Sequence, residues 1–308
     1  MPLSNSSATE QTRDVLATGV RSLLGAHLVA QPKVADRVRG VSRRPWTIMT
    51  VPGETADILE PGVPRRLMRA GDVVVHAAVR GPVSGRTLSE RATDASMDTR
   101  SVCALLDAAR AADARRVVLV VTPGAGADAA VRESAVARAR AAGLDVRRLY
   151  LGLATGSADK GPSWIGRMML AFAAGRLRTF VPGVLPLVSA EDAGRSLARL
   201  ALDEDLPVGG DFVLPSDLVD TRELFELWAD EVGPRSRPWH RPAFRFCGRL
   251  PRWVDLDAEL AAPPRVPEAA ISLRREVDLT QSIHRAFAWF SDVGHLQRAR
   301  SDPAFLRG

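Results

Sequence analysis

Two uninterrupted apolar runs, separated by an amphipathic segment, constrain the fold more than any other feature of this sequence. They read DVVVHAAV (residues 72–79) and VVLVV (117–121), and neither alternates with polar residues. Strands of that kind are buried on both faces, as in a parallel sheet covered by helices. The segment SVCALLDAARAADA (101–114) between them has the periodicity of a helix. The sequence therefore predicts βαβ units with right-handed crossovers.

The same alternation of strands and helices runs through much of the chain. Further strands are expected at 14–17, 38–42 and 144–153. Helices are expected at 23–38 (broken near Pro32), 129–142, 163–175, 190–202 and 221–232. The predicted fold class is α/β, a Rossmann-type doubly wound parallel sheet with a smaller C-terminal substrate-binding region. We expect a flexible N-terminus (1–13), a dinucleotide-binding core (14–156), and a substrate-binding or lid region (157–308) interleaved with the end of the core.

Composition excludes several classes of protein. With 46% apolar residues in 308, there is ample material for a core, and no apolar run approaches the ~20 residues of a membrane span. The start of the chain lacks a hydrophobic signal segment, so we expect a cytoplasmic protein with no membrane partner. The net charge is +6, but Lys33 and Lys160 are the only lysines among 42 basic residues. This arginine bias is typical of a high-GC genome, so no nucleic-acid partner is predicted.

Cysteine and histidine indicate no metal or disulfide chemistry. Cys103 and Cys247 lie far apart and are interpreted as buried small residues. His240, His284 and His295 lack metal-ligand spacing, so no metal is predicted. His76 follows a buried strand and is interpreted as a structural histidine.

A glycine-containing turn follows the first predicted strand in DVLATGVRSLLG (residues 14–25). Its spacing is that of a dinucleotide-binding turn, in which helix N–H groups face a pyrophosphate. Gly19 would make the turn and Gly25 would let the helix pack closely, while Ser22 stands where a middle glycine is usual. Leu23 and Leu24 begin the helix. An ordinary strand–turn–helix has the same pattern, and that alternative stays open at this point.

The second predicted strand ends in GVSRRP (40–45). In a dinucleotide fold an acid at this position binds the ribose hydroxyls, whereas arginine accommodates a 2′-phosphate. Ser42, Arg43 and Arg44 stand there and no acid does, which favours NADP(H) over NAD(H). The alternative is two surface arginines in an arginine-rich chain.

Together these segments resemble the extended short-chain dehydrogenases/reductases, the family of nucleotide-sugar epimerases and dehydratases. TGVRSLLG is similar to the family's TGxxGxxG turn, ADI (56–58) to its adenine-binding Asp-aliphatic pair, and DVVVHAAV to its DVVIHLAA strand. The segment 143–156 is similar to a later strand that usually ends in Arg-Pro-Gly, and LVSAEDAGRSLARLAL to a following helix. Beyond the turn and the arginines, the resemblance implies cofactor contacts from Asp57, Ile58, Ala77, Ala78, Val79, Thr122, Leu151 and Gly152.

The chain departs from the family at its catalytic residues. The family's YxxxK motif is absent, the only tyrosine is Tyr150 on a later strand, and neither lysine aligns with the missing one. Thr122 matches the family's Ser/Thr position and is the one catalytic candidate. Asp98 replaces an Asn that is usual near the start of a helix.

These features support three functional hypotheses. The first is an NADPH-dependent ketoreductase acting on an aromatic polyketide in antibiotic biosynthesis, with the proton supplied by a substrate hydroxyl or by water because Tyr and Lys are missing. The second is a non-catalytic NADP-binding sensor. The third is a redox-neutral cyclase or isomerase.

The remaining predictions concern the substrate and the oligomeric state. The partner is a small-molecule substrate, bound beyond the carboxyl ends of the strands. Family members often dimerise through two helices, one of which is altered here, so a monomer and a homodimer are both allowed. The expected pocket liners are Ser84, Ser96, Leu153, Trp164, Met168 and Met169, each of which has core packing as its alternative.

Overall fold

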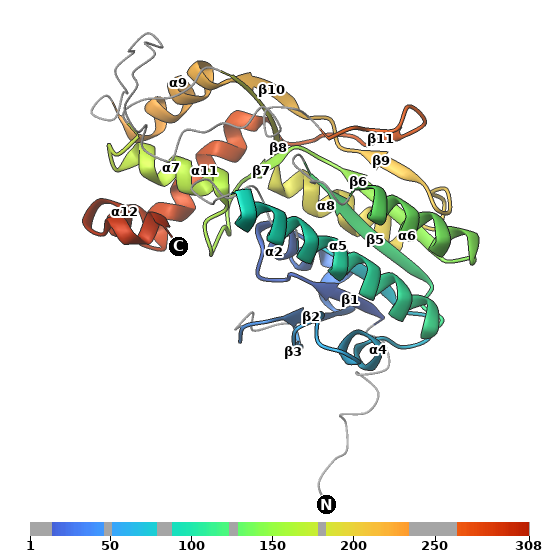
Figure 1. The fold of residues 1–308 in the computed structure, drawn as a ribbon. Coiled ribbons are helices and arrows are strands. Elements are labelled where there is room, and N and C mark those ends of the chain that lie inside the picture. Colours follow the sequence, from blue (N-terminus) through green and yellow to red (C-terminus); the bar gives the residue numbers. More distant parts are fainter. Residues whose placement is uncertain are drawn as a thin grey trace, which may run out of the picture.

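An eight-stranded parallel sheet forms the centre of the molecule (Figure 1). The computed structural model describes residues 14–45, 51–78, 88–122, 129–177, 183–233 and 264–307. The strand order is β11-β9-β6-β5-β4-β1-β2-β3, and every neighbouring pair is parallel. The strands are β1 (Val15–Thr18), β2 (Val38–Ser42), β3 (Gly53–Thr55), β4 (Val73–His76), β5 (Arg116–Val121), β6 (Asp145–Tyr150), β9 (Asp211–Val213) and β11 (Ile271–Ser272). The predicted Rossmann-type α/β fold is confirmed.

Helices cover both faces of this sheet, which explains the unbroken apolar runs in the sequence. Successive side chains of a strand point to opposite faces. On β4, Val73 and Val75 join one buried cluster and Val74 joins another. The first cluster packs against α2 (Leu23–Val29) and α8 (Ala190–Leu202), and the second against α5 (Leu88–Ala111) and α6 (Ala129–Ala141). Short helices α3 (Pro32–Ala35) and α4 (Val63–Leu67) complete this part.

A second, smaller sheet and a third apolar cluster lie beside the main sheet. The sheet has the order β10-β8-β7, with β8 parallel to β7 and antiparallel to β10. Its elements and helices are β7 (Leu153–Thr155), α7 (Trp164–Ala173), β8 (Val184–Ser189), β10 (Asp217–Asp220), α9 (Thr221–Val232), α11 (Leu279–Asp292), α12 (His295–Ser301) and the 3₁₀ helix η2 (Pro303–Arg307). Stacked and edge-on aromatic rings of Phe172, Phe225 and Trp228 fill the centre of this cluster. The division at residue 156 into a core and a substrate region stays a prediction.

Several predicted boundaries differ from the observed ones. The segment 144–153, predicted as one strand, divides into β6 and β7. The division falls at Leu151–Gly152, where the chain leaves the main sheet for the small one, and a Cβ on Gly152 would lie only 2.6 Å from Ser216 Oγ. The helix predicted at 101–114 begins earlier, at Leu88. The chain breaks at Pro32 as predicted, because proline there begins a new helix.

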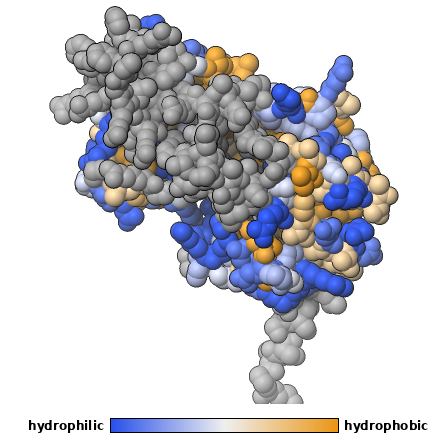
Figure 2. Space-filling model, viewed as in Figure 1, coloured by the Kyte–Doolittle hydropathy of each residue, from blue (hydrophilic) through white to orange (hydrophobic). Residues whose placement is uncertain are grey.

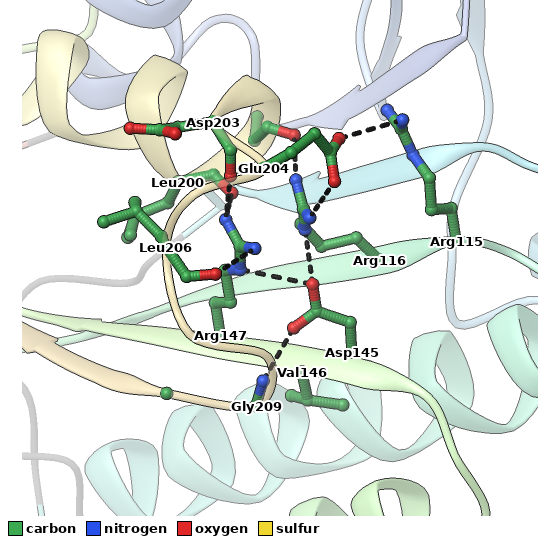
Figure 3. Close-up of polar contacts among 12 residues, drawn as sticks. Arg115, Arg116, Asp145, Val146, Arg147, Leu200, Asp203, Glu204, Leu206 and Gly209 are labelled. Carbon is green, nitrogen blue, oxygen red and sulfur yellow. Dashed lines mark hydrogen bonds and ion pairs between the residues drawn. The ribbon is translucent and has the colours of Figure 1, made fainter.

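Three arginines are buried in β5 and β6. Arg116, Arg147 and Arg148 are 2%, 0% and 6% exposed. Figure 3 shows Arg116 between Asp145 and Glu204, and Arg147 turned toward the end of α8. Arg116 and Arg147 therefore tie β5 and β6 to the C-terminal end of α8, whereas Arg148 pairs with Glu133 and Asp211.

Among the helices described, none is both long and apolar enough to cross a bilayer. On the face seen in Figure 2, hydrophobic residues are interspersed with hydrophilic ones.

Candidate functional site

A cavity of about 530 Å³ lies over the carboxyl ends of β1, β2 and β4. Its walls come from segments that are well separated in sequence. The lining residues are Thr18, Gly19, Arg21, Ser22, Val41, Ser42, Arg43, Arg44, Ala56, Asp57, Ile58, Leu59, His76, Ala78, Asp98, Ser101, Lys160 and Gly161. Ligands of open α/β sheets bind at this edge, so this cavity is the candidate site.

The turn between β1 and α2 requires glycine at two positions. Gly19 has φ +73°, in the left-handed region, and a Cβ there would lie 2.5 Å from the backbone of Ala78. A Cβ on Gly25 would lie 2.7 Å from the Cα of Val20, with the carbonyl oxygen of Gly19 closer still. The first glycine therefore brings the turn against the end of β4, and the second lets the helix pack on the turn.

Ser22, which replaces the usual middle glycine, is built into the turn. It is the N-cap of α2, where its hydroxyl oxygen accepts a hydrogen bond from the Gly25 N–H (3.1 Å). The same hydroxyl donates to the carbonyl of Ala77 (2.9 Å), just beyond β4. Ser22 thus links the turn after β1 to the end of β4. Leu23 and Leu24 are buried and do not line the cavity.

The end of the cavity beside β2 is basic. Arg43 and Arg44 follow β2, are exposed, and form no ion pair with a described carboxylate. Ser42 Oγ accepts a long hydrogen bond from the Arg44 N–H (3.4 Å). The neighbouring loop is joined to β2 by the Ala56 N–H, which donates to the Ser42 carbonyl (3.0 Å). In this loop the Asp57 carboxylate accepts a hydrogen bond from the Leu59 N–H (2.9 Å), which shapes the turn that carries Ile58. The predicted 2′-phosphate and adenine residues therefore lie in one wall.

The floor of the cavity holds a buried, uncharged histidine. His76 Nδ1 lies 2.6 Å from Thr18 Oγ1, so the pair joins the ends of β4 and β1. Burial lowers the pKa of His76 to about 4, which leaves the imidazole neutral at pH 7. It adds no charge to the site.

Residues 15–139 match the NAD dependent epimerase/dehydratase family. This confirms the resemblance inferred from the sequence, and the matched segment contains β1, the glycine turn, the two arginines and β4. No curated protein matches the sequence closely enough to be counted.

Solved structures of this kind share the fold over most of the chain. A nucleoside-diphosphate-sugar epimerase from Pseudomonas aeruginosa is 18% identical, with a TM-score of 0.65 over 91% of this chain and 98% of its own. A UDP-glucose 4-epimerase from Thermus thermophilus, solved with NAD, is 18% identical, with a TM-score of 0.65 over 90% and 98%. A dTDP-glucose 4,6-dehydratase from Streptomyces venezuelae, solved with NAD, is 19% identical, with a TM-score of 0.64 over 91% and 98%. At these identities the likeness establishes the fold alone.

Some predicted cofactor contacts lie beside the cavity rather than in its wall. Ala77 and Leu151 are buried core residues, and Gly152 is packed against Ser216. Thr122, the catalytic candidate, follows the last residue of β5, is half-buried, and is not a lining residue. Val79 lies outside the described residues.

The predicted substrate contacts do not gather at this cavity. Leu153, Trp164 and Met169 are buried in the third apolar cluster, and Met168 packs against it. Thr155 Oγ1 donates a hydrogen bond to the Met169 sulfur (3.6 Å), so the Met169 side chain is held in the core. Core packing, the alternative considered for these residues, is what the structure has. Ser84 lies outside the described residues, and Ser96 lies in the part of α5 where side chains are not described.

The lone tyrosine does not replace the family's catalytic one. Tyr150 is 3% exposed in β6, and the Arg148 guanidinium carbon lies 5.4 Å from the centre of its ring. Burial raises the pKa of this phenol to about 12. Tyr150 does not line the cavity, so it is not available there as a proton donor.

Ten lining residues were not predicted as cofactor contacts: Thr18, Arg21, Val41, Ala56, Leu59, His76, Asp98, Ser101, Lys160 and Gly161. Arg21 lies in the turn itself, and Gly161 adjoins Lys160. Asp98 and Ser101 lie well inside α5, because this helix begins at Leu88. Lys160 follows β7, and nothing in its sequence neighbourhood indicates a cofactor site.

Proposed function

We propose that this chain binds NADP(H) in the cavity and transfers a hydride between it and a carbonyl or hydroxyl of a small molecule. The observation that carries the proposal is the basic end of the cavity. Arg43 and Arg44 stand where an NAD-selective protein has an acid, and they have no described carboxylate partner. The match to an NAD dependent family over residues 15–139 supports the cofactor class.

The residues of the cavity fit the adenosine and phosphate part of a dinucleotide. Arg43 and Arg44 would hold the 2′-phosphate, and Asp57 with Ile58 would flank the adenine. Gly19 would allow close approach of the phosphates to the backbone, since no side chain projects there. When bound, the nicotinamide supplies or accepts the hydride.

The finer proposal is reduction of a ketone whose own hydroxyl, or water, supplies the proton. It is supported by the absence of YxxxK and by the burial of Tyr150 away from the cavity. A positioned general acid contributes typically about 10²–10⁴-fold, so reduction without one is slower but feasible. Phenolic polyketides with a hydroxyl beside the ketone satisfy this requirement. Thr122 would accept or donate a hydrogen bond at the substrate oxygen.

The same missing residues favour a second candidate, an NADP-binding sensor without catalysis. The two candidates share the cofactor and differ only in turnover. A screen of phenolic ketones for NADPH oxidation separates them, because a sensor binds NADPH and oxidises none of it.

The first test is titration of the protein with NADPH and NADH, followed by fluorescence. We expect NADPH to bind more tightly. The double variant Arg43→Met/Arg44→Met should lose this preference, by about tenfold or more, because hydrogen bonds to charged groups contribute about 1.5–3 kcal/mol. The matched control is Arg65→Met/Arg69→Met, which removes equal charge from exposed positions outside the cavity. Binding of neither nucleotide would refute the proposal, and equal loss in both double variants would refute the assignment of Arg43 and Arg44.

A further inference from the structure

A strap, residues 156–163, joins β7 to α7 and passes from the small sheet to the cavity. Within it, Lys160 and Gly161 line the cavity. The strap belongs to the part of the chain that the family match over residues 15–139 does not include. It therefore brings to the cavity a cation from outside the matched segment.

The strap is held in place on both sides of Lys160. His27 Nε2, in α2, is hydrogen-bonded to the carbonyl of Ser157 (2.9 Å). His295 Nε2, in α12, is hydrogen-bonded to the carbonyl of Lys160 itself (3.2 Å). The buried Asp159 carboxylate accepts the Ser163 N–H at 2.8 and 2.9 Å. The backbone that presents the Lys160 side chain is thus fixed before any ligand arrives.

The strap also contains a backbone conformation that needs support. Ala158 has φ +62°, which residues with a Cβ rarely adopt. It lies between Ser157 and Asp159, the residues held by His27 and by Ser163. A strained backbone conformation persists only where neighbouring contacts hold it. Here the contacts of Ser157 and Asp159 hold Ala158, and the same contacts fix the position of the Lys160 backbone.

Lys160 lines the same cavity as the turn between β1 and α2. Gly19, Arg21 and Ser22 of that turn line the cavity together with Lys160. His27, which holds the strap at Ser157, lies in the last turn of the helix that begins at this glycine turn. Two residues lie between Ser157 and Lys160, so their Cα atoms are at most about 10 Å apart.

The charges in the cavity indicate what such an ammonium group would bind. Arg21, Arg43, Arg44 and Lys160 line it, against the carboxylates of Asp57 and Asp98. Arg43 and Arg44 follow β2, whereas the strap with Lys160 follows β6 and β7, and β6 lies on the other side of β1 from β2 in the main sheet. Two separate groups of cations fit a ligand with two separate sites of negative charge.

From these contacts we infer that Lys160 binds the diphosphate bridge of the dinucleotide, as a fixed clamp over the glycine turn. The inference rests on the proposed function and adds to it the residue that holds the phosphates common to NADP(H) and NAD(H). Arg43 and Arg44 then determine the choice between the two cofactors, and Lys160 determines affinity for both.

The test compares Lys160→Met with Lys33→Met, the only other lysine, which is exposed on α3 and outside the cavity. Dissociation constants are measured for NADPH, NADH and ADP. ADP keeps the diphosphate and lacks the nicotinamide ribose. Lys160→Met should weaken all three by a similar factor of about tenfold, as expected for loss of a charged hydrogen bond, and Lys160→Arg should restore most of the affinity. Lys33→Met should match the wild type.

Each other outcome overturns the inference in a distinguishable way. Unchanged affinities in Lys160→Met would remove the clamp and leave the proposed function standing. Loss for NADPH alone would assign Lys160 to the 2′-phosphate, and loss for both dinucleotides with ADP unaffected would assign it to the nicotinamide ribose. If the wild-type protein binds none of the three, the proposed function fails and the inference fails with it.

Discussion

Replacing Arg147 with methionine would remove a buried charge that holds a helix end against the sheet. Its guanidinium group donates to the carbonyls of Leu200 (3.0 Å), Asp203 (2.7 Å) and Leu206 (3.0 Å), at and beyond the end of α8 (Figure 3). Its Nε lies 3.2 Å from an Asp145 oxygen. The side chain is fully buried, so water cannot replace these contacts.

The expected loss follows from what the variant leaves behind. Three carbonyls lose a charged donor, and leaving a buried polar group unsatisfied costs about 1–3 kcal/mol. Asp145 keeps two other partners, Arg116 (2.6 Å) and the Gly209 N–H (2.8 Å), so it is not stranded. Breaking a buried pair from one side costs about 3–5 kcal/mol in total, and the remaining partners of Asp145 favour the lower end. We therefore expect Arg147→Met to lower the free energy of unfolding by about 3 kcal/mol.

Urea unfolding followed by circular dichroism measures this change as a shift of the midpoint at constant slope. The matched control is Arg222→Met, whose ion pair with Glu226 on α9 has side chains 65% and 66% exposed. Such a pair contributes about 0.5 kcal/mol. If the two variants lose the same stability, or Arg147→Met is more stable than the wild type, the reasoning from burial is wrong.

Two further predictions test the turn and the strap. Gly25→Ala should weaken NADPH binding at least tenfold, because its Cβ would lie only 2.7 Å from the Cα of Val20. The control Gly183→Ala, whose Cβ would meet no atom within 4 Å, should bind NADPH normally. Equal NADPH affinities of the two variants would contradict the close packing at Gly25. Burial raises the pKa of Asp159 from 3.8 to about 6, so this group stabilises the fold most below pH 4 and loses that contribution as the pH rises through 6. Asp159→Asn stays neutral, so its melting temperature should exceed that of the wild type by more at pH 8 than at pH 5. If the melting temperatures of the two proteins differ by the same amount at every pH, Asp159 does not titrate in this range.

Much of the fold is predictable from the sequence because its causes are local. The runs 72–79 and 117–121 are predicted as buried strands; the first contains β4 (Val73–His76) and the second lies within β5 (Arg116–Val121). The helices at 190–202 and 221–232 have the predicted bounds. Their signals are local, because each helix has a polar N-cap (Ser189 and Asp220) and an apolar periodicity that spans only one or two turns. The glycine turn is predictable for the same reason.

Other features depend on contacts between distant segments. The burial of Arg147 follows from carbonyls supplied by α8, and the core position of Trp164 and Met169 from helices later in the chain. The periodicity of α7 specifies an apolar face without specifying whether a cavity or a core lies opposite it.

The amino-acid sequence by itself determined five strands of the main sheet (β1, β2, β4, β5 and β6), the helices α2, α5, α6, α7, α8 and α9, and the two glycines of the turn, because steric limits and hydrophobic periodicity act over a few residues. Only the tertiary structure decided that Lys160 joins the same cavity as Gly19 and Arg43. That meeting depends on the hydrogen bonds of His27 and His295 to the strap, and their partners are chosen by packing between parts of the chain far apart in sequence.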